Sequence, residues 1–255
     1  MRLDCHTRES TLFCVSRLFG VSTGQVDDFL LGLDLDAYCR EHPVEGYGDT
    51  IVTMLAEREF GPIQHDLSAV SWFHLTRVLP GEDFGAGILP LGEALDGVWT
   101  TLERIFDGTR HVERLRTLRR EGVSDWLFRL KVPDPFFWGP YAMLIRDAAF
   151  RSGEIGNHDY LGTPEIVQDI CHGYEARFGL RIEDEVQAAL HPCIVKFTSD
   201  RRLDRGCVKA AAFYLYLTVH GRPMSLHSND CFDGGGVAVP PSEVELVEFI
   251  ATEAF

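Results

Sequence analysis

Lysine is rare in this sequence, and several patterns that mark common protein classes are missing. Only three of the 24 basic residues are lysine, a bias more typical of a GC-rich genome than of any chemistry. No run of 18 apolar residues is present, so no membrane-spanning helix is predicted. The opening MRLDCHTRES lacks the apolar stretch of a signal peptide. We therefore expect a cytoplasmic protein without a membrane partner.

Paired cysteine motifs are also missing. The seven cysteines are an odd number and none stands in a C-x-x-C pair, which predicts reduced thiols rather than a disulfide framework. Only His227 and Cys231 approach the spacing of zinc ligands, so no metal site is expected. The sequence also lacks G-x-G-x-x-G, and this absence argues against a dinucleotide-binding Rossmann domain.

Positive charge is scarce, with 39 acidic and 24 basic residues giving a formal net charge of −15. Sequence-independent binding of nucleic acid needs a basic surface that releases counterions, so this balance argues against it. A local basic groove stays open as an alternative. The segments 110–120 and 201–205 are its only candidates, and both are more typical of solvated helix and loop surfaces.

The chain has the composition of a globular protein, with 255 residues of which 45% are apolar. Apolar residues at helical spacing predict helices in the first sixty residues, and Ser22 or Thr23 could cap a helix through Gln25–Leu31. We expect a helical N-terminal segment over residues 1–65 and a second domain over residues 66–255.

In the rest of the chain, predicted strands and helices follow one another without regular alternation, which predicts an α+β fold. The apolar stretch Val208–Val219 is predicted to form a buried helix or strand. The predicted strands are 70–79, 193–199 and 243–250, and the predicted helices are 91–106, a basic helix ending near 120, and a helix beginning near 163–164.

One segment carries a pattern with chemical meaning. Residues 72–91 read WFHLTRVLPGEDFGAGILPL, in which His74 and Thr76 stand two positions apart on a predicted strand. Such residues project to the same face, where an imidazole and a hydroxyl can bind one ligand. The alternative is that His74 is an ordinary histidine, hydrogen-bonded on a half-buried strand.

This segment resembles the entry motif of the ADP-ribosyltransferase superfamily, which includes the poly-ADP-ribose polymerases and the DarT-type toxins. His74 and Thr76 match its H-x-T pair, and Gly87-Ile88-Leu89 matches the G-I-L continuation that leads into a helix. The resemblance implies a split, mainly antiparallel sheet and NAD as substrate. It further implies that His74 and Thr76 bind the two riboses and that the backbone of Leu75 holds the nicotinamide amide. Leu75 replaces the glycine common in the polymerases.

The resemblance also implies an aromatic that stacks on nicotinamide and a glutamate on a late strand. Tyr141 and Tyr160 are candidates for the aromatic. For the glutamate, alternation along the strand EVELVEFI places Glu248 with three aliphatic residues, where a carboxylate needs a partner or a role. Glu248 is therefore the predicted catalytic residue and Glu245 the next. The alternative is an edge strand whose acidic residues face water.

The leading interpretation is an NAD-dependent transferase that passes ADP-ribose to a macromolecular acceptor, or an NAD glycohydrolase. By analogy it would be a bacterial toxin or defence effector. One alternative is a non-catalytic interaction protein of the same fold. A second is a metal-dependent phosphoesterase, indicated by GNHD at 156–159 with Asp4, His6 and Asp49, although its G-H-x-H motif is missing.

Overall fold

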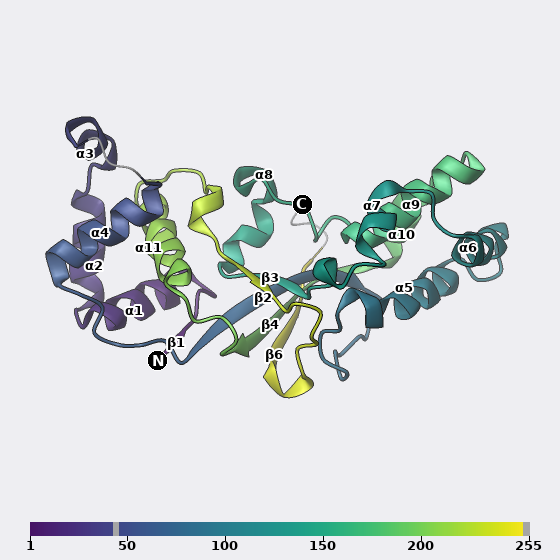
Figure 1. Ribbon diagram of the computed structural model, residues 1–255, viewed down its shortest axis with the longest axis horizontal. Helices are drawn as coiled ribbons and strands as arrows, with labels where there is room; N and C mark the ends of the chain where they lie inside the picture. The colour runs from purple at the N-terminus through teal and green to yellow at the C-terminus, as the bar shows by residue number, and fades with distance from the viewer. Residues whose placement is uncertain (43–45, 252–255) are drawn as a thin grey trace. The chain divides into compact units, whose positions relative to one another are not determined.

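The computed structural model describes residues 1–42 and 46–251 as a mixed fold of helices and strands (Figure 1). Helices make up 52% and strands 14% of the structure, and the sheet is mainly antiparallel, which confirms the predicted α+β class. The chain forms two compact units whose segments alternate along the sequence. The first contains Met1–Phe73, Ala142–His158 and Phe197–Phe232, and the second contains His74–Tyr141, Asp159–Lys196 and Asp233–Phe255.

The sheet has the strand order β5-β3-β2-β4-β6, and β1 pairs with β2 outside this path. β1 and β2 run parallel, whereas β2 and β3 run antiparallel with Phe73 opposite Met143. All three predicted strands are confirmed, as β2, β4 and β6. The strands are β1 (Arg2–Leu3), β2 (Ala69–Val78), β3 (Tyr141–Met143), β4 (His191–Ser199), β5 (Cys231–Asp233) and β6 (Val244–Phe249).

Helices dominate the first unit. The side chain of Ser22 accepts a hydrogen bond from the Gln25 amide at the start of α2, so the predicted cap is confirmed. Thr7 caps α1 in the same way with Ser10. The helices are α1 (Arg8–Phe19), α2 (Thr23–Gly32), α3 (Leu35–Glu41), α4 (Gly48–Phe60), α8 (Ser152–Ile155) and α11 (Arg205–Val219), with 3-10 turns η2 (Arg146–Phe150) and η3 (Leu226–Ser228).

The helix α11 forms the centre of the first unit. Its apolar run was expected to be either a helix or a strand, and the structure shows a helix whose residues from Cys207 to Leu217, apart from Lys209, are buried. A helix that is apolar on all sides needs neighbours on all sides. α11 packs against α1, α2, α4 and the turn η3, and the three helices lie beside it in Figure 1.

The second unit has its own hydrophobic core. Helix α5 contributes Trp99 and Leu102, α6 contributes Leu115 and Leu118, and α9 contributes Ile170. These residues recur at helical spacing, so each helix presents one apolar face. The helices are α5 (Leu91–Ile105), α6 (Arg110–Glu121), α7 (Trp126–Lys131), α9 (Glu165–Phe178) and α10 (Glu183–Ala189), with 3-10 turns η1 (Pro135–Phe137) and η4 (Pro241–Glu243).

Gly87 allows two distant segments of the second unit to approach closely. Its φ angle is +81°, and a Cβ atom there would lie 2.1 Å from the carbonyl oxygen of Val239. Ile88, the next residue, forms an antiparallel bridge with Val239. Only glycine fits this position without displacing the backbone. Gly87-Ile88-Leu89 therefore forms a bridge first, and α5 begins at Leu91 behind Pro90.

No helix in the described ranges has both the length and the apolar character needed to cross a bilayer.

Candidate functional site

His74 and Thr76 lie on the side of β2 to which Trp72 points, and ring contacts with Phe232 on β5 identify this side. The Trp72 ring centroid lies 5.6 Å from that of Phe232, and the Phe197 centroid lies 5.0 Å from the same ring. Trp72 on β2 and Phe197 on β4 therefore point to the same side. Because strand residues alternate, His74 and Thr76 follow Trp72 onto that side.

We call the part of this side that belongs to the second unit the His74 face: His74 and Thr76 on β2, and Cys193 and Val195 on β4. The opposite side carries the hydroxyls of Ser71 and Thr198, which lie 3.2 Å apart, so both strands keep the same alternation. His74 and Thr76 are half-buried, whereas Leu75 between them is buried on the opposite side. The predicted pair therefore shares one partly accessible face.

The His74 imidazole is held in one orientation by a single hydrogen bond. Its Nδ1 atom lies 2.8 Å from the carbonyl oxygen of Tyr141. A carbonyl oxygen only accepts, so Nδ1 carries the proton and Nε2 of the neutral ring is left as an acceptor. Burial lowers the pKa of His74, and the bond to Tyr141 opposes this shift only in part. His74 therefore presents a neutral ring at neutral pH.

The two glutamates on β6 have different surroundings. Glu245 pairs with Lys196 on β4, with 3.6 Å between Oε2 and Nζ. Burial, and after it the negative charge of Glu248, raise the pKa of the Cys193 thiol to about 12. The negative charge of Glu248 thus acts on a residue of the His74 face.

The face of β6 that carries Glu248 is less buried than its aliphatic residues predict. Alternation placed this glutamate with aliphatic residues that were expected to be buried, yet Leu246 is 45% exposed and Glu248 itself is half-buried. β6 ends the strand order, and all its residues are half-buried or exposed. This is the edge-strand environment that the sequence left open as the alternative.

The two candidate tyrosines differ in position. Phe73 pairs with Met143, so Met143 and, two residues earlier, Tyr141 project to the side opposite His74. The Tyr141 side chain bonds to the carbonyl of Phe136, and only its backbone oxygen reaches His74. The structure therefore does not bring the Tyr141 ring onto the His74 face. Tyr160 is half-buried in the loop before α9.

Sequence reasoning missed Arg77, which organises the loop that contains Tyr160. Its guanidinium donates to the carbonyl oxygens of Leu161, Gln187 and Leu190 at 2.6–2.7 Å. Arg77 alternates with Leu75, so it projects away from the His74 face. No local pattern marks such a residue, because its partners lie more than 80 positions away.

Within the described ranges, one group of side chains has the geometry to hold a metal ion: Asp204, Cys207 and Asp230. The guanidinium of Arg202 already bonds to both carboxylates of this group, with its Nε atom 3.1 Å from Asp204 and an Nη atom 2.9 Å from Asp230. A guanidinium at both carboxylates takes the place that a cation would need. None of these residues belongs to the phosphoesterase pattern read from the sequence.

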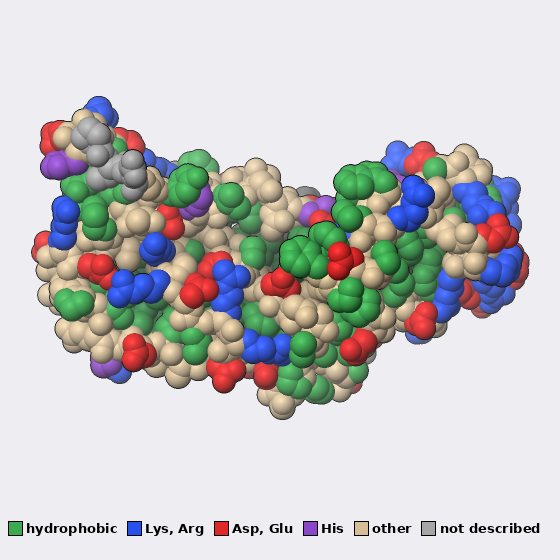
Figure 2. Space-filling model, viewed as in Figure 1, with side chains coloured by type: hydrophobic (Ala, Val, Ile, Leu, Met, Phe, Trp, Pro, Cys, Tyr) green, Lys and Arg blue, Asp and Glu red, His purple; other side chains and the backbone are tan. Residues whose placement is uncertain are grey.

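Apolar side chains are exposed on another part of the second unit. Trp126 and Leu130 on α7 are 66% and 42% exposed, and Phe136 in η1 is 73% exposed. Hydrophobic side chains around α7 are visible at the surface in Figure 2. Exposed aromatic side chains that gather in this way are typical of interaction surfaces.

Comparisons of the chain with protein-family models, with curated proteins and with solved structures found no match.

The lowered pKa of His74 predicts a pH dependence of stability. An unfolded histidine titrates near pH 6.5, so at lower pH the unfolded chain binds a proton that folded His74 resists. The free energy of unfolding should fall as the pH drops below about 6.5, until His74 also titrates in the folded state. Urea titrations across this range should give a flatter dependence for His74→Gln. Identical pH profiles in the two proteins would contradict the shift.

Proposed function

We propose that the second unit binds NAD on the His74 face and transfers its ADP-ribose to a macromolecular acceptor or to water. The observation that carries this proposal is the shared face of His74 and Thr76, with the imidazole held as a neutral acceptor. The H-x-T pattern and the following Gly87-Ile88-Leu89 support it by resemblance. An ADP-ribosyltransferase-like arrangement of the sheet, and a role as a bacterial toxin or defence effector, are parts of the same proposal.

The residues have separate roles in this reaction. His74 Nε2 accepts a hydrogen bond from one ribose hydroxyl, and Thr76 bonds to the ribose beside nicotinamide. The Leu75 backbone holds the nicotinamide amide. The bond between the ribose C1′ and the nicotinamide nitrogen breaks, nicotinamide leaves as a neutral molecule, and the acceptor oxygen or nitrogen bonds to C1′ and releases its proton. Glu248 stabilises the positive charge that develops on the ribose.

Tyr160 is the tyrosine proposed to stack on nicotinamide. Tyr141 projects to the opposite side, so Tyr160 is the remaining tyrosine candidate for contact with nicotinamide. Tyr160→Ala should therefore weaken NAD binding, and Tyr141→Phe should leave it unchanged.

Binding of NAD can be tested by calorimetry on the parent protein and His74→Ala. Loss of one hydrogen bond to a buried polar group costs about 1–3 kcal/mol, so we expect the variant to bind NAD about tenfold more weakly. His172→Ala is the matched control, because this exposed histidine lies on α9 of the same unit. The proposal is wrong if the parent does not bind NAD, or if folded His74→Ala binds as tightly as the parent.

Catalysis is tested separately by release of nicotinamide. Glu248→Gln should keep NAD affinity but lower kcat by about 10²–10³, the effect of losing one group that stabilises a transition state. Glu245→Gln is the control on the same strand, and it should change kcat little because Glu245 pairs with Lys196. Equal rates in all three proteins would remove Glu248 from the mechanism.

An interaction protein without catalysis is the second candidate. The exposed Trp126, Leu130 and Phe136 favour it, because monomeric proteins rarely leave such side chains together in water. In that case His74→Ala would leave function intact, while serine at Trp126 and Phe136 would abolish partner binding.

A further inference from the structure

Lys209 is a charged residue in an otherwise apolar helix. Between Gly206 and Val219 of α11 it is the only charged side chain, and Val208 and Ala210 on either side are buried. Lys209 itself is half-buried. An ammonium group in such surroundings costs free energy unless it has a partner or a role.

The partners of Lys209 differ from those of the other two lysines. Lys131 contacts two carboxylates at 3.0 and 2.8 Å, and Lys196 contacts one at 3.6 Å. Lys209 donates to the hydroxyl of Thr50 at 3.3 Å, and among the described residues no carboxylate lies within ion-pair distance of it. An ammonium group has three donors, so most of its capacity remains for a ligand.

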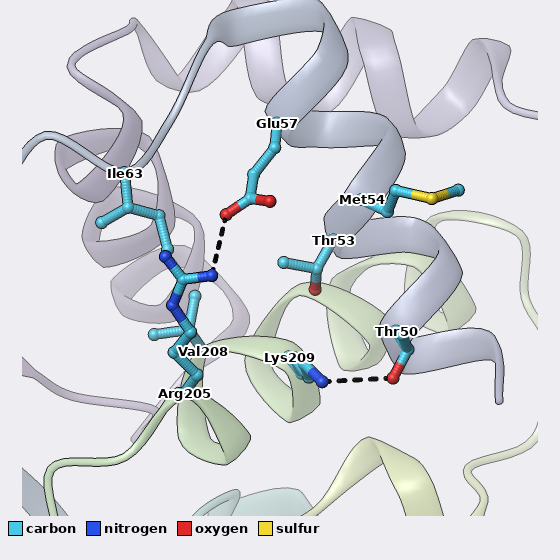
Figure 3. Close-up of a pocket in the computed structure, with 8 residues that line it drawn as sticks. All are labelled: Thr50, Thr53, Met54, Glu57, Ile63, Arg205, Val208 and Lys209. Atoms are coloured by element: carbon cyan, nitrogen blue, oxygen red, sulfur yellow. Dashed lines mark hydrogen bonds and ion pairs between the residues drawn. The ribbon is translucent and has the colours of Figure 1, made fainter. Parts of the chain in front are cut away.

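A small cavity lies beside Lys209, between α4 and α11 in the first unit. Arg205, one turn before Lys209, also borders it, and the Arg205 Nη1 atom lies 3.6 Å from the Glu57 Oε1 atom. Figure 3 shows Arg205 and Lys209 reaching from α11 toward α4. The cavity has a volume of about 110 Å³ and is lined by Thr50, Thr53, Met54, Glu57, Ile63, Arg205, Val208 and Lys209.

We propose that this cavity binds a phosphoryl group through Lys209, Arg205 and the hydroxyl of Thr50. Two cations and a hydroxyl offer donors to a tetrahedral oxyanion, whereas Glu57 is the only acid among the lining residues. The volume is below that of sites for whole organic ligands, about 300–1,000 Å³, so the cavity takes the anion and not a larger group. The proposal is independent of NAD binding, because all its residues belong to the first unit.

Glu57 competes with the anion for Arg205 in this arrangement. Its side chain is 30% exposed, while that of Arg205 is 74% exposed, so the pair can separate at little cost. The bound phosphoryl group would take the place of the Glu57 carboxylate beside the guanidinium. Removing the Glu57 charge should therefore strengthen binding, whereas removing the Lys209 charge should weaken it.

Calorimetry with inorganic phosphate tests the site, at an ionic strength kept constant with chloride. Lys209→Met, which retains the length and apolar stem of the side chain, should bind phosphate at least about tenfold more weakly. Thr50→Val should weaken binding in the same direction and serves as the second variant if Lys209→Met does not fold. Arg58→Gln is the matched control, since it removes an exposed cation of α4 that does not border the cavity.

Glu57→Gln should change the phosphate affinity in the opposite direction. We expect binding about threefold tighter, which corresponds to the free energy of an exposed ion pair. Glycerol 2-phosphate then distinguishes the source: binding of this ester as well as phosphate indicates a phosphorylated metabolite, and binding of phosphate alone indicates the free anion. No heat in the parent beyond that of added chloride, unchanged affinity in folded Lys209→Met, or weaker binding in Glu57→Gln would overturn the proposal.

Discussion

Replacing Lys131 with methionine is expected to lower the free energy of unfolding by about 3–5 kcal/mol, as when a buried ion pair loses one partner. The Lys131 Nζ atom lies 2.8 Å from Asp169, whose side chain is only 2% exposed. It also contacts Glu165 at 3.0 Å, so one lysine joins the end of α7 to the first turns of α9. Without the lysine, the Asp169 carboxylate would remain buried and unpaired.

The pH dependence of this loss separates the ion pair from simple packing. Burial already raises the pKa of Asp169, with Lys131 opposing that shift, and removing Lys131 should raise the pKa further. A group whose folded pKa is raised regains stability as the pH falls through that value. Urea titrations should therefore show a smaller deficit for Lys131→Met at acid pH than at pH 7.

A double variant tests the cause. Lys131→Met combined with Asp169→Leu should recover most of the lost stability, because apolar residues of similar volume often replace a buried ion pair without loss. If the double variant is less stable than Lys131→Met alone, the carboxylate has a role that does not depend on the lysine.

Replacing Arg77 with methionine is expected to destabilise the protein by at least about 3 kcal/mol, since each hydrogen bond from a charged donor contributes about 1.5–3 kcal/mol. The three carbonyl oxygens that it binds belong to the loop before α9 and to the end of α10. All three would lose a strong donor together. Thermal unfolding should show the loss of stability, and hydrogen exchange should locate it at residues 159–163 and 187–190.

Arg77→Lys is the informative control. A lysine keeps the charge but lacks the fixed fork of a guanidinium, so it should recover only part of the stability. Recovery to the parent value would mean that charge alone, and not the geometry of the three bonds, holds this loop.

Local sequence patterns predicted the long elements of this fold. The helix at Leu91–Ile105 has a clear period of apolar residues, the strand at Ala69–Val78 is rich in β-branched and aromatic residues, and the cap at Ser22 has its own short motif. Short elements such as α7 carry too few residues to show a period. The division into two interleaved units depends on pairing between distant segments, which no local pattern encodes.

The same limit applies to the candidate site. Alternation alone placed His74 and Thr76 on one face, and the structure agrees. For Glu248 alternation was insufficient, because the burial of β6 depends on its place at the end of the strand order. For Tyr141, the sequence could not give the register of Phe73 with Met143, which sets the direction of its ring. Arg77 and Lys131 were missed because their partners are distant in sequence.

The position of β6 has a consequence for how the protein behaves at high concentration. An edge strand is open to pairing with another strand, and the exposed Leu246 and Phe249 favour addition of β6 to the sheet of a second molecule. Glu245 comes directly before Leu246, and Glu248 comes directly before Phe249. Two strands that approached edge to edge would bring their carboxylates together and repel each other. Whatever their part in chemistry, these glutamates would help to keep the protein from self-association.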